Sequence, residues 1–303
     1  PEGVEPGTGA PVVMYGHGLT FWKESMLVVS PANAARGWAT LGIDYPQHGE
    51  RAGQETAVFP QLFESRYLGQ MAGTLNQGSI DLVSLQKAIV TSFAEIDVID
   101  ADAPWWAYDA ADGHPDLDPS RLIYQGTSMG AVLGATFLGL TPERVRAAVL
   151  HVPGAGITHI QTNSSLWSGL PISFERMVPR GATLAEESAL ISIAQQLLDY
   201  GDAASWFDLA TARGTEVVVP FATADGLVPG IATQRLLELG GIAVVDAESM
   251  VSGAAPLTAA AGFGEPLVTD VLGGLAAHLA FAAPEARRFE DAWFALVTED
   301  LGW

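Results

Sequence analysis

The sequence predicts an α/β fold in which a mainly parallel sheet is flanked by helices. Short apolar runs of strand length alternate with longer segments of helical periodicity along most of the chain. No internal repeat interrupts this succession. A chain of 303 residues, 49% of them hydrophobic, is long enough to bury one sizeable core, so we expect a single domain over residues 1–303.

The predicted strands are short apolar runs, most of them followed by a turn or loop signal. They cover residues 11–15, 38–43, 121–125, 145–152, 216–221 and 242–245. The first strand ends at a Gly-His-Gly sequence and the second at Asp-Tyr-Pro. The acidic stretch before the third strand contains proline and glycine and is expected to be a loop.

The predicted helices have apolar residues at helical spacing or recognisable ends. They cover residues 79–93, 129–140, 183–200, 231–239 and 284–298. The second ends before Pro142, because proline cannot continue a helix. The third begins with a capping-box pattern of Thr183 and Glu186, and Gly201 supplies its stop. The last begins with a proline, which is favoured at the first position of a helix.

Residues 126–130 read Gly-Thr-Ser-Met-Gly and match the G-x-S-x-G pattern of a nucleophile elbow. The bare pattern is weak evidence in a chain with 33 glycines. Its context strengthens it, because an apolar strand runs into it and a helix rich in glycine and alanine follows. Such a turn holds the serine in a strained backbone conformation with its hydroxyl exposed. We therefore predict Ser128 as a nucleophile; the alternative is glycine-rich packing between a strand and a helix.

A serine nucleophile needs a base, usually a histidine held in one tautomer by a carboxylate. Enzymes with such an elbow carry the triad in the order serine, acid, histidine. Of the three histidines after Ser128, His151 ends a strand and His159 falls in an unusually long connection. His278, beyond the last predicted strand, is therefore the predicted base, although an isolated histidine often has a structural role.

Asp225 is the predicted acid of the triad. It directly follows the strand over residues 216–221, where this acid usually lies. A position after the preceding strand is excluded, because residues 151–174 include no acidic residue. Asp246 and Asp270 are competitors, and a surface-loop role for Asp225 is the alternative.

The tetrahedral intermediate of acyl transfer needs two backbone N–H donors aimed at its oxyanion. One is expected from Met129, the residue after the nucleophile. The other is expected from Leu19, in the loop that follows the first strand. His17 lies in the same loop but precedes the serine, so we expect it to have a structural role there.

The alternation of strands and helices breaks over residues 153–213, a segment too long for an ordinary connection. We interpret it as a helical cap inserted into the single domain. Because the flanking strands end at the catalytic edge of a parallel sheet, the cap is expected to lie over Ser128 as a lid. Leu190, Leu197 and Trp167 are expected to contact an acyl chain. Tryptophan residues that are alternative pocket candidates, although each is more often core, are Trp105, Trp106 and Trp206.

The ordered landmarks of the chain are His17-Gly18, residues 44–51, residues 126–130, residues 225–229 and His278. This set resembles the α/β-hydrolase superfamily over residues 11–281. The block after Asp44 and the Gly-Thr-Ser-Met-Gly elbow are similar to bacterial serine esterases and lipases. The resemblance favours a secreted or cell-envelope location, which the residues themselves leave open. Members usually have two strands before the His-Gly strand, so the sheet is expected to be short at that edge or the chain to be a fragment of a longer precursor.

The formal net charge of −21 comes from 35 acidic residues against only 14 basic ones. A surface of this sign repels phosphate backbones and anionic lipids, so we expect no nucleic-acid partner and favour a small uncharged ester as substrate. No apolar stretch reaches the roughly 18 residues of a membrane span, so no transmembrane segment is expected. The absence of cysteine excludes disulfides and thiolate metal sites. The sequence carries no signal for an oligomeric state.

No cofactor and no metal are expected from the motifs. The acidic stretch invites a calcium interpretation with Asp109, Asp112, Asp116 and Asp118 as ligands, but their spacing does not fit the calcium-binding loop pattern. A solvated loop is favoured.

The predicted function is that of a serine hydrolase of esterase or lipase type, which cleaves carboxylic esters through an acyl-enzyme intermediate. One alternative is a serine peptidase or amidase, because the same triad serves amides. Another is a non-catalytic binding module of the same fold, although such modules typically lose part of the triad. A dehalogenase is disfavoured, because its nucleophile would be an aspartate where this chain has Ser128.

Overall fold

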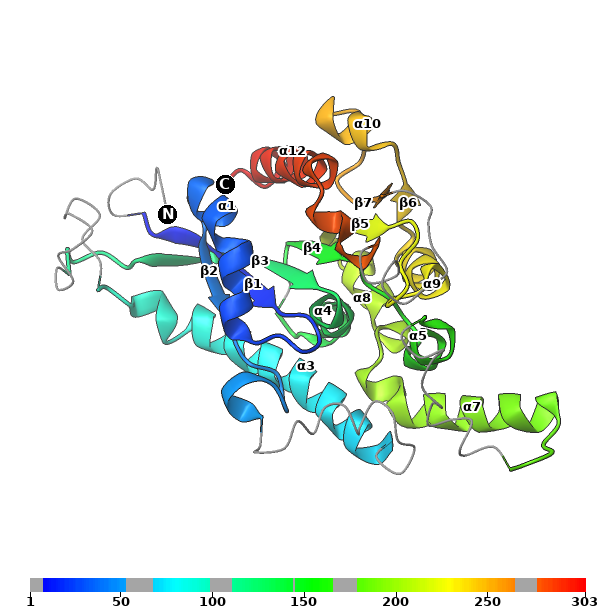
Figure 1. Ribbon diagram of the computed structural model, residues 1–303. Helices are drawn as coiled ribbons and strands as arrows, with labels where there is room; N and C mark the ends of the chain where they lie inside the picture. Colours follow the sequence, from blue (N-terminus) through cyan, green and yellow to red (C-terminus); the bar gives the residue numbers. More distant parts are fainter. Residues whose placement is uncertain (1–7, 53–67, 99–110, 144, 166–178, 265–276) are drawn as a thin grey trace.

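The computed structural model describes residues 8–52, 68–98, 111–143, 145–165, 179–264 and 277–303. Its centre is a seven-stranded sheet in which every pair of neighbours is parallel, in the order β2-β1-β3-β4-β5-β7-β6 (Figure 1). The strands are β1 (Ala10–Gly16), β2 (Ala39–Gly42), β3 (Leu117–Thr127), β4 (Ala147–His151), β5 (Glu216–Ala222), β6 (Ala243–Val244) and β7 (Ala259–Phe263). The α/β fold predicted from the sequence is confirmed.

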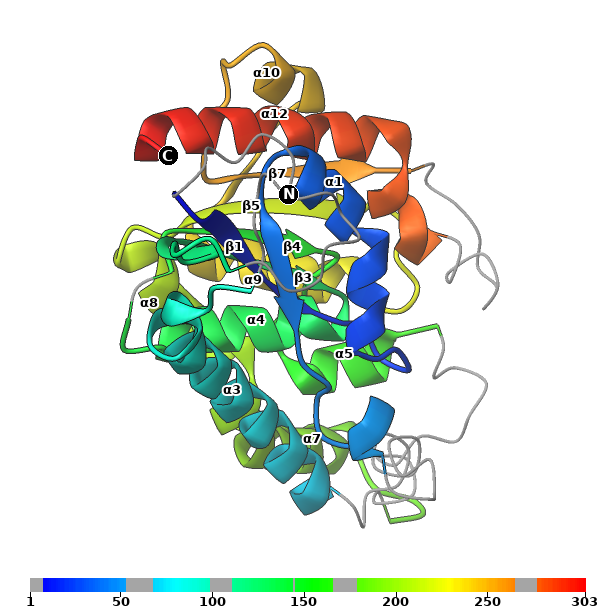
Figure 2. The same ribbon diagram turned by 90° about the vertical axis from the view of Figure 1, so that its left-hand side faces the viewer.

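Helices cover both faces of this sheet (Figure 2). On one face lie α1 (Ser30–Ala35) and α12 (Pro284–Leu301), with α10 (Ala247–Val251) packed against α12. On the other face lie α3 (Leu68–Val90), α4 (Met129–Leu140), α8 (Phe207–Ala212) and α9 (Gly230–Gly240). None of the described helices is both long and apolar enough to cross a membrane.

Alternating side chains of the central strands supply a separate core to each face, as the pleat of a strand requires. In β3, Leu122 and Tyr124 enter the core under α3 and α4, whereas Ile123 enters the core under α12. Because both faces are covered, β1 is buried along its whole length rather than alternately buried and exposed. The sheet is therefore a rigid platform for the loops at its edges.

The strand β7 was not among the predicted strands. Its residues are mainly alanines, which have low β propensity. Ala259 and Ala261 pack in one core cluster with the large aromatic side chains of Phe289 and Trp293 on α12. Most of the side-chain volume of that core comes from α12, so the small alanines of β7 are enough to fill the remaining space. No local sequence pattern marks these alanines as a strand.

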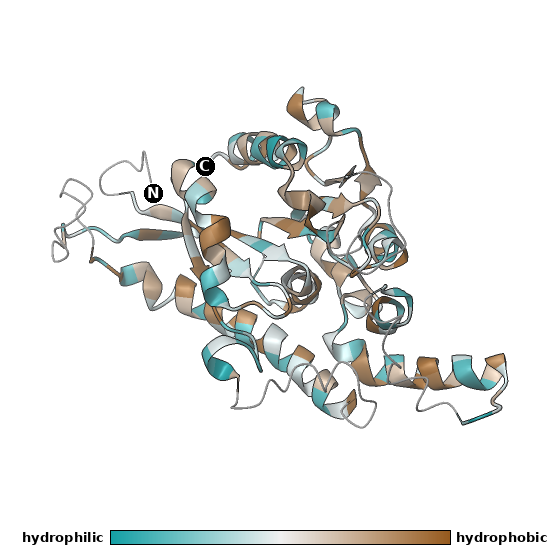
Figure 3. Ribbon diagram, viewed as in Figure 1, coloured by the Kyte–Doolittle hydropathy of each residue, from teal (hydrophilic) through white to brown (hydrophobic). Residues whose placement is uncertain are grey.

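Two further helices, α5 (Ile157–Asn163) and α7 (Leu184–Leu198), lie in the segment interpreted as a cap. Thr183 caps α7, and its capping box with Glu186 is present as predicted. Ala194 and Leu198 bury one side of α7 in a small core with residues of α3, α4 and α5. Apolar and polar residues alternate along α7 (Figure 3). Leu197 is 53% exposed.

Candidate active site

Ser128 occupies a sharp turn between the end of β3 and the start of α4. Its backbone has φ 56° and ψ −119°, a strained conformation for a residue other than glycine. A Cβ atom on Gly126 would lie 2.5 Å from the carbonyl oxygen of Gly130, and one on Gly130 would overlap the carbonyl of Gly16. The two glycines of the motif are therefore required for the close approach of strand, turn and helix, as in a nucleophile elbow.

His278 and Asp225 lie side by side although 53 residues separate them in the chain. Nδ1 of His278 donates to Oδ2 of Asp225 at 2.7 Å, with Oδ1 at 2.9 Å. The two side chains are only 7% and 2% exposed. The Asp225 carboxylate also accepts the backbone N–H groups of Leu227 and Val228, at 2.8 and 2.9 Å. This fixes the orientation of the carboxylate and places the imidazole proton on Nδ1, so Nε2 is left as an acceptor.

Ser128 and Asp225 both follow the carboxyl ends of strands, the edge where parallel α/β sheets bind ligands. The residues after Asp225, Leu227 and Val228, line the same pocket as Ser128. Within the described residues no hydrogen bond joins the Ser128 hydroxyl to His278. Catalytic hydrogen bonds are often long in the absence of a substrate and tighten when it binds.

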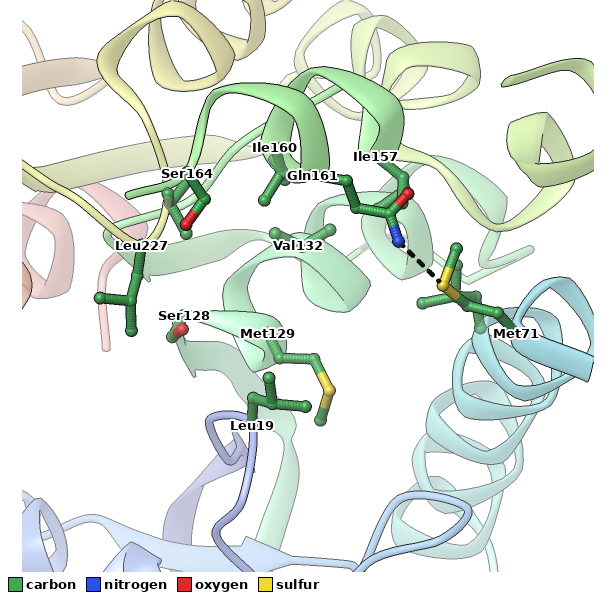
Figure 4. A pocket seen from close by; sticks show the side chains of 12 residues that line it. Leu19, Met71, Ser128, Met129, Val132, Ile157, Ile160, Gln161, Ser164 and Leu227 are labelled. Carbon is green, nitrogen blue, oxygen red and sulfur yellow. Dashed lines mark hydrogen bonds between the residues drawn. The ribbon is translucent and has the colours of Figure 1, made fainter. Parts of the chain in front are cut away.

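Leu19 and Met129 border the same pocket, on the side of Ser128 that faces the loop after β1 (Figure 4). A Cβ atom on Gly18 would lie 3.6 Å from Cβ of Ser128, so this loop passes directly beside the serine. Met129 is the first residue of α4, so its N–H has no acceptor inside the helix. Among the described residues, the backbone hydrogen bonds of turns, loops and helix caps include none donated by the N–H of Leu19 or of Met129. The predicted role of these two N–H groups as oxyanion donors requires such a lack of backbone acceptors.

Asp44, which follows β2, hydrogen-bonds to the segment that follows the Leu19 loop. The Asp44 carboxylate is 4% exposed and accepts the backbone N–H of Lys23 at 2.7 Å and that of Glu50 at 3.1 Å. Burial alone would raise the pKa of Asp44, but these N–H groups and the Lys23 ammonium outweigh burial and hold the pKa below its usual value. An ionised Asp44 thus connects the loop after β1 to the loop after β2.

His17 is fully buried beneath this loop and serves as a structural residue, as the sequence predicted. Its Nδ1–H donates to the carbonyl of Gly18 at 2.9 Å, and its Nε2 accepts the backbone N–H of Tyr45 at 3.1 Å. Burial is the main cause that lowers its pKa to about 4. Because Nε2 is already occupied, a neutral His17 cannot act as the base for Ser128.

The pocket beside Ser128 is a mainly apolar cavity of about 130 Å³. Its walls come from the Leu19 loop, α3, α4, α5 and the loop after Asp225. The lining residues are Leu19, Met71, Leu75, Ser128, Met129, Val132, Ile157, Ile160, Gln161, Ser164, Leu227 and Val228. The amide of Gln161 is turned toward Met71, and its Nε2 donates to the Met71 sulfur at 3.4 Å (Figure 4). The described lining carries no charged side chain.

The sequence-based choice of pocket residues from residues 153–213 was wrong for α7. Leu190 borders a separate surface hollow with Pro179 and Ile193, and Leu197 is exposed to solvent. One wall of the pocket is instead α5, whose residues Ile157, Ile160 and Gln161, together with Ser164 directly after the helix, recur at positions i, i+3, i+4 and i+7. That one-faced helical spacing is a signal that the sequence contained.

The other candidate residues have different surroundings. Asp246 caps α10 by accepting the N–H of Glu248 at 2.9 Å, so it does not compete with Asp225. Nε1 of Trp206 donates to the carbonyl of Tyr200, and its backbone packs against Gly139 at the far end of α4 from Ser128. Candidate residues that lie outside the described ranges are Trp105, Trp106, Asp109, Trp167 and Asp270.

Three of the four aspartates considered as calcium ligands, Asp112, Asp116 and Asp118, have protein partners in the described part of the chain. Asp118 pairs with Arg121 Nε at 2.6 Å, and Asp112 accepts the N–H of His114 at 2.9 Å. In the part of the chain that the structure describes, no cluster of three or more potential metal ligands occurs.

The sequence model of the alpha/beta hydrolase fold family matches residues 11–212. No curated protein matches the sequence at a significant level. A Bacteroides ovatus protein described as a dipeptidyl aminopeptidase IV has a similar fold, with a TM-score of 0.50 and 13% identity over 96% of this chain and 32% of its own. The Thermus thermophilus protein TT1662 has a TM-score of 0.49 and 19% identity, over 95% of this chain and 90% of its own. An esterase of Pyrococcus furiosus, Pf2001, has a TM-score of 0.48 and 16% identity, over 95% and 83%. At such identities the likeness concerns the fold alone.

Proposed function

The chain belongs to the α/β-hydrolase fold family, and on this premise we propose that it is a serine hydrolase that cleaves carboxylic esters with an apolar acyl group. The observation that carries the proposal is the position of Ser128. It stands in a strained, left-handed turn at the edge of an apolar pocket, on the sheet edge that also carries Asp225 with its partner His278. A hydroxyl in that position meets the carbonyl of an ester whose acyl group fills the pocket.

In the proposed reaction, Ser128 Oγ attacks the ester carbonyl carbon while Nε2 of His278 takes the hydroxyl proton. Asp225 stabilises the imidazolium that forms, and its hydrogen bond to Nδ1 keeps Nε2 in the acceptor state before the attack. The backbone N–H groups of Leu19 and Met129 receive the negative charge on the carbonyl oxygen.

The intermediate collapses when His278 returns the proton to the leaving alcohol oxygen, and the acyl group stays on Ser128. Water then attacks the acyl-enzyme, with His278 again acting as base, and releases the carboxylic acid. Apart from the ester and this water, the cycle uses the side chains and backbone N–H groups named above. We propose in addition that residues 153–213 form a cap whose helix α5 supplies one wall of the acyl pocket.

The lining of the pocket favours an ester over a peptide with a free amino terminus. In the described lining, the polar groups near Ser128 are the Gln161 amide and the Ser164 hydroxyl, and no carboxylate is present to pair with an ammonium group. Burying an unpaired charge is costly, so a charged substrate terminus would bind poorly there.

The test compares the wild type with Ser128→Ala on p-nitrophenyl esters and on peptide p-nitroanilides. We expect ester turnover by the wild type and a loss of several orders of magnitude in the variant, with an unchanged circular-dichroism spectrum and melting temperature. Labelling of Ser128 by a fluorophosphonate, located by mass spectrometry, identifies the nucleophile directly. Near wild-type ester turnover by a pure Ser128→Ala sample would reject the proposal, and faster turnover of the peptide series would favour a peptidase.

A further inference from the structure

A second histidine–carboxylate pair lies behind the nucleophile turn and has no part in the chemistry described above. His151 is the last residue of β4 and Glu290 lies on α12, and Nε2 of His151 donates to Oε2 of Glu290 at 2.7 Å. The two side chains are only 2% and 11% exposed. A buried ionic or strongly polar pair is often no more stabilising than well-packed apolar residues of the same volume. Its presence next to Ser128 therefore points to a role beyond stability.

The neighbouring residues fix the charge of Glu290 and the position of the proton on His151. Burial raises the pKa of Glu290, but the charge and hydrogen bond of His151, together with Arg36 and Arg287, outweigh burial and leave the pKa below its usual value. Glu290 is thus a carboxylate, and its second oxygen accepts from Nε2 of Gln125 at 2.9 Å. Both oxygens accept hydrogen bonds, so His151 must keep its proton on Nε2.

His151 holds the nucleophile turn in two ways. Its backbone carbonyl accepts the N–H of Ser128 at 2.9 Å, and its Nδ1 lies 3.4 Å from Oγ1 of Thr127, its register partner on β3. The residue after His151, Val152, has φ 47°, which is a rare conformation for a β-branched side chain. Two strained residues, Ser128 and Val152, therefore follow neighbouring strand ends, and such strain persists only where the surroundings impose it.

The same imidazole also contacts the turn that carries His278. The ring of Phe281 stacks on the ring of His151 with centroids 5.0 Å apart and an interplanar angle of 26°. Phe281 belongs to the short 3-10 helix η7 (Leu279–Ala282), and His278 is the residue that precedes this helix. One buried side chain thus touches the structural elements of both the proposed nucleophile and the proposed base.

We propose that His151 and Glu290 are a positioning pair that holds the turn of Ser128 and the turn of His278 at a fixed separation. The proposal rests on the proposed function, because it concerns the same two reacting groups. Glu290 fixes the tautomer and tilt of the imidazole, and the imidazole transmits this position to Thr127 on one side and to Phe281 on the other. A misplacement of reacting groups by about 1 Å costs roughly 100-fold in rate.

The first test is Glu290→Gln, which keeps the shape of the side chain but replaces one acceptor oxygen by an amide NH₂. Either a donor, His151 Nε2–H or the Gln125 amide, then faces another donor, or His151 shifts its proton to Nδ1 and loses the tautomer that Glu290 imposes. We expect kcat for p-nitrophenyl acetate to fall roughly 10- to 100-fold with KM changed less than about twofold. The rate of fluorophosphonate labelling of Ser128 should fall in parallel.

A second pair of variants tests the contact with the base and serves if Glu290→Gln does not fold. Phe281→Leu removes the stacked ring and should lower kcat. Phe281→Tyr keeps the ring, and its kcat should equal that of the wild type. The matched control is Thr141→Val, which removes a buried hydrogen bond to Gln86 at the far end of α4. It should lose comparable stability, measured as the melting temperature, without a change in kcat.

Each outcome separates the two proposals. Values of kcat and labelling rate within twofold of the wild type in both Glu290→Gln and Phe281→Leu would overturn the positioning pair, as would losses no larger than those of Thr141→Val. A wild-type protein that is labelled at Ser128 but turns over no ester would reject ester hydrolysis alone, because the labelling rates still decide the positioning role. Absence of labelling in the wild type would overturn both.

Discussion

The carboxylate of Asp202 accepts a hydrogen bond of 2.6 Å from the backbone N–H of Ile157, the first residue of α5. Asp202 is fully buried and also accepts the N–H groups of Gly156 and Ala204, each at 2.9 Å. A fourth donor, Nε2 of Gln195 on α7, completes the set at 2.7 Å. Since Ile157 lines the pocket beside Ser128, one carboxylate sets the position of the pocket wall and joins it to α7.

Asp202→Asn should therefore destabilise the protein by about 2–4 kcal/mol, because at least one buried N–H donor then faces an amide NH₂. The free energy of unfolding in urea at pH 7 measures the effect. Asp199→Asn is the matched control, since the Asp199 carboxylate accepts from the same Gln195 amide at 3.0 Å but, among the described residues, accepts no hydrogen bond from α5. We expect it to cost less than about 0.5 kcal/mol. Equal losses in the two variants would contradict a special role of Asp202.

Asp225→Asn should fold normally and lose roughly 10³- to 10⁴-fold in kcat on a short ester, because the amide no longer holds His278 in the reactive tautomer. Its matched control is Asp246→Asn, the competing acid in the sequence, which caps α10 instead. That variant should keep wild-type kcat and lose about 1 kcal/mol of stability at most. Wild-type kcat in Asp225→Asn, or inactivity in Asp246→Asn, would show that the acid has been assigned to the wrong residue.

The sequence was most informative where a feature is local. The elbow at Ser128 consists of a strand, two glycines and a helix that follow one another within a short segment. The start of α7 is marked by Thr183 and Glu186 alone. Both features could therefore be recognised without a structure. The order of the triad in the resemblance pointed to Asp225 and His278, which the structure shows as a hydrogen-bonded pair.

Long-range features could not be recognised in the same way. The alanines of β7 form a strand only because the aromatic residues of α12 fill the space beside them. His151 and Glu290 are 139 residues apart and follow no motif, so nothing in the chain joins them before it folds. The helix α7 has a clear helical pattern, from which Leu190 and Leu197 were predicted to contact an acyl chain, whereas the short α5 supplies one wall of the pocket.

Val132 lines, from α4, the pocket proposed for the acyl group and is only 5% exposed, so its size would limit an acyl group bound there. Val132→Phe should lower kcat/KM for p-nitrophenyl hexanoate roughly 10- to 100-fold relative to the acetate, because the added ring occupies the space of the longer chain. Leu197→Ala is the control, since Leu197 is exposed on α7. Its ratio of hexanoate to acetate kcat/KM should equal that of the wild type. An unchanged ratio in Val132→Phe would place the acyl chain elsewhere.

The buried His17 should make the protein less stable in acid. Its pKa is about 4 in the folded protein and about 6.5 in an unfolded chain, so the unfolded chain binds the proton more tightly. Its contribution to stability is therefore present above pH 6.5 and is lost as the pH falls from 6.5 through 4. The full effect is about 3 kcal/mol. Burial also lowers the pKa of the neighbouring His48, so His48 likewise makes the protein less stable as the pH falls. The pKa of Asp44 is held below its usual value, so its negative charge is lost only at still lower pH.

His17→Gln removes this titration but leaves His48 and Asp44 in place, so its comparison with the wild type isolates His17. We expect the variant to be less stable at pH 7, because the packing under the loop is altered, but to lose less stability than the wild type between pH 6.5 and pH 4. Urea unfolding at four or five pH values in this window measures both curves. His114→Gln is the control, because His114 is exposed to solvent, and its curve should run parallel to that of the wild type. If the His17→Gln curve were parallel to the wild-type curve as well, His17 would not be the neutral, buried acceptor of the Tyr45 N–H that the structure shows.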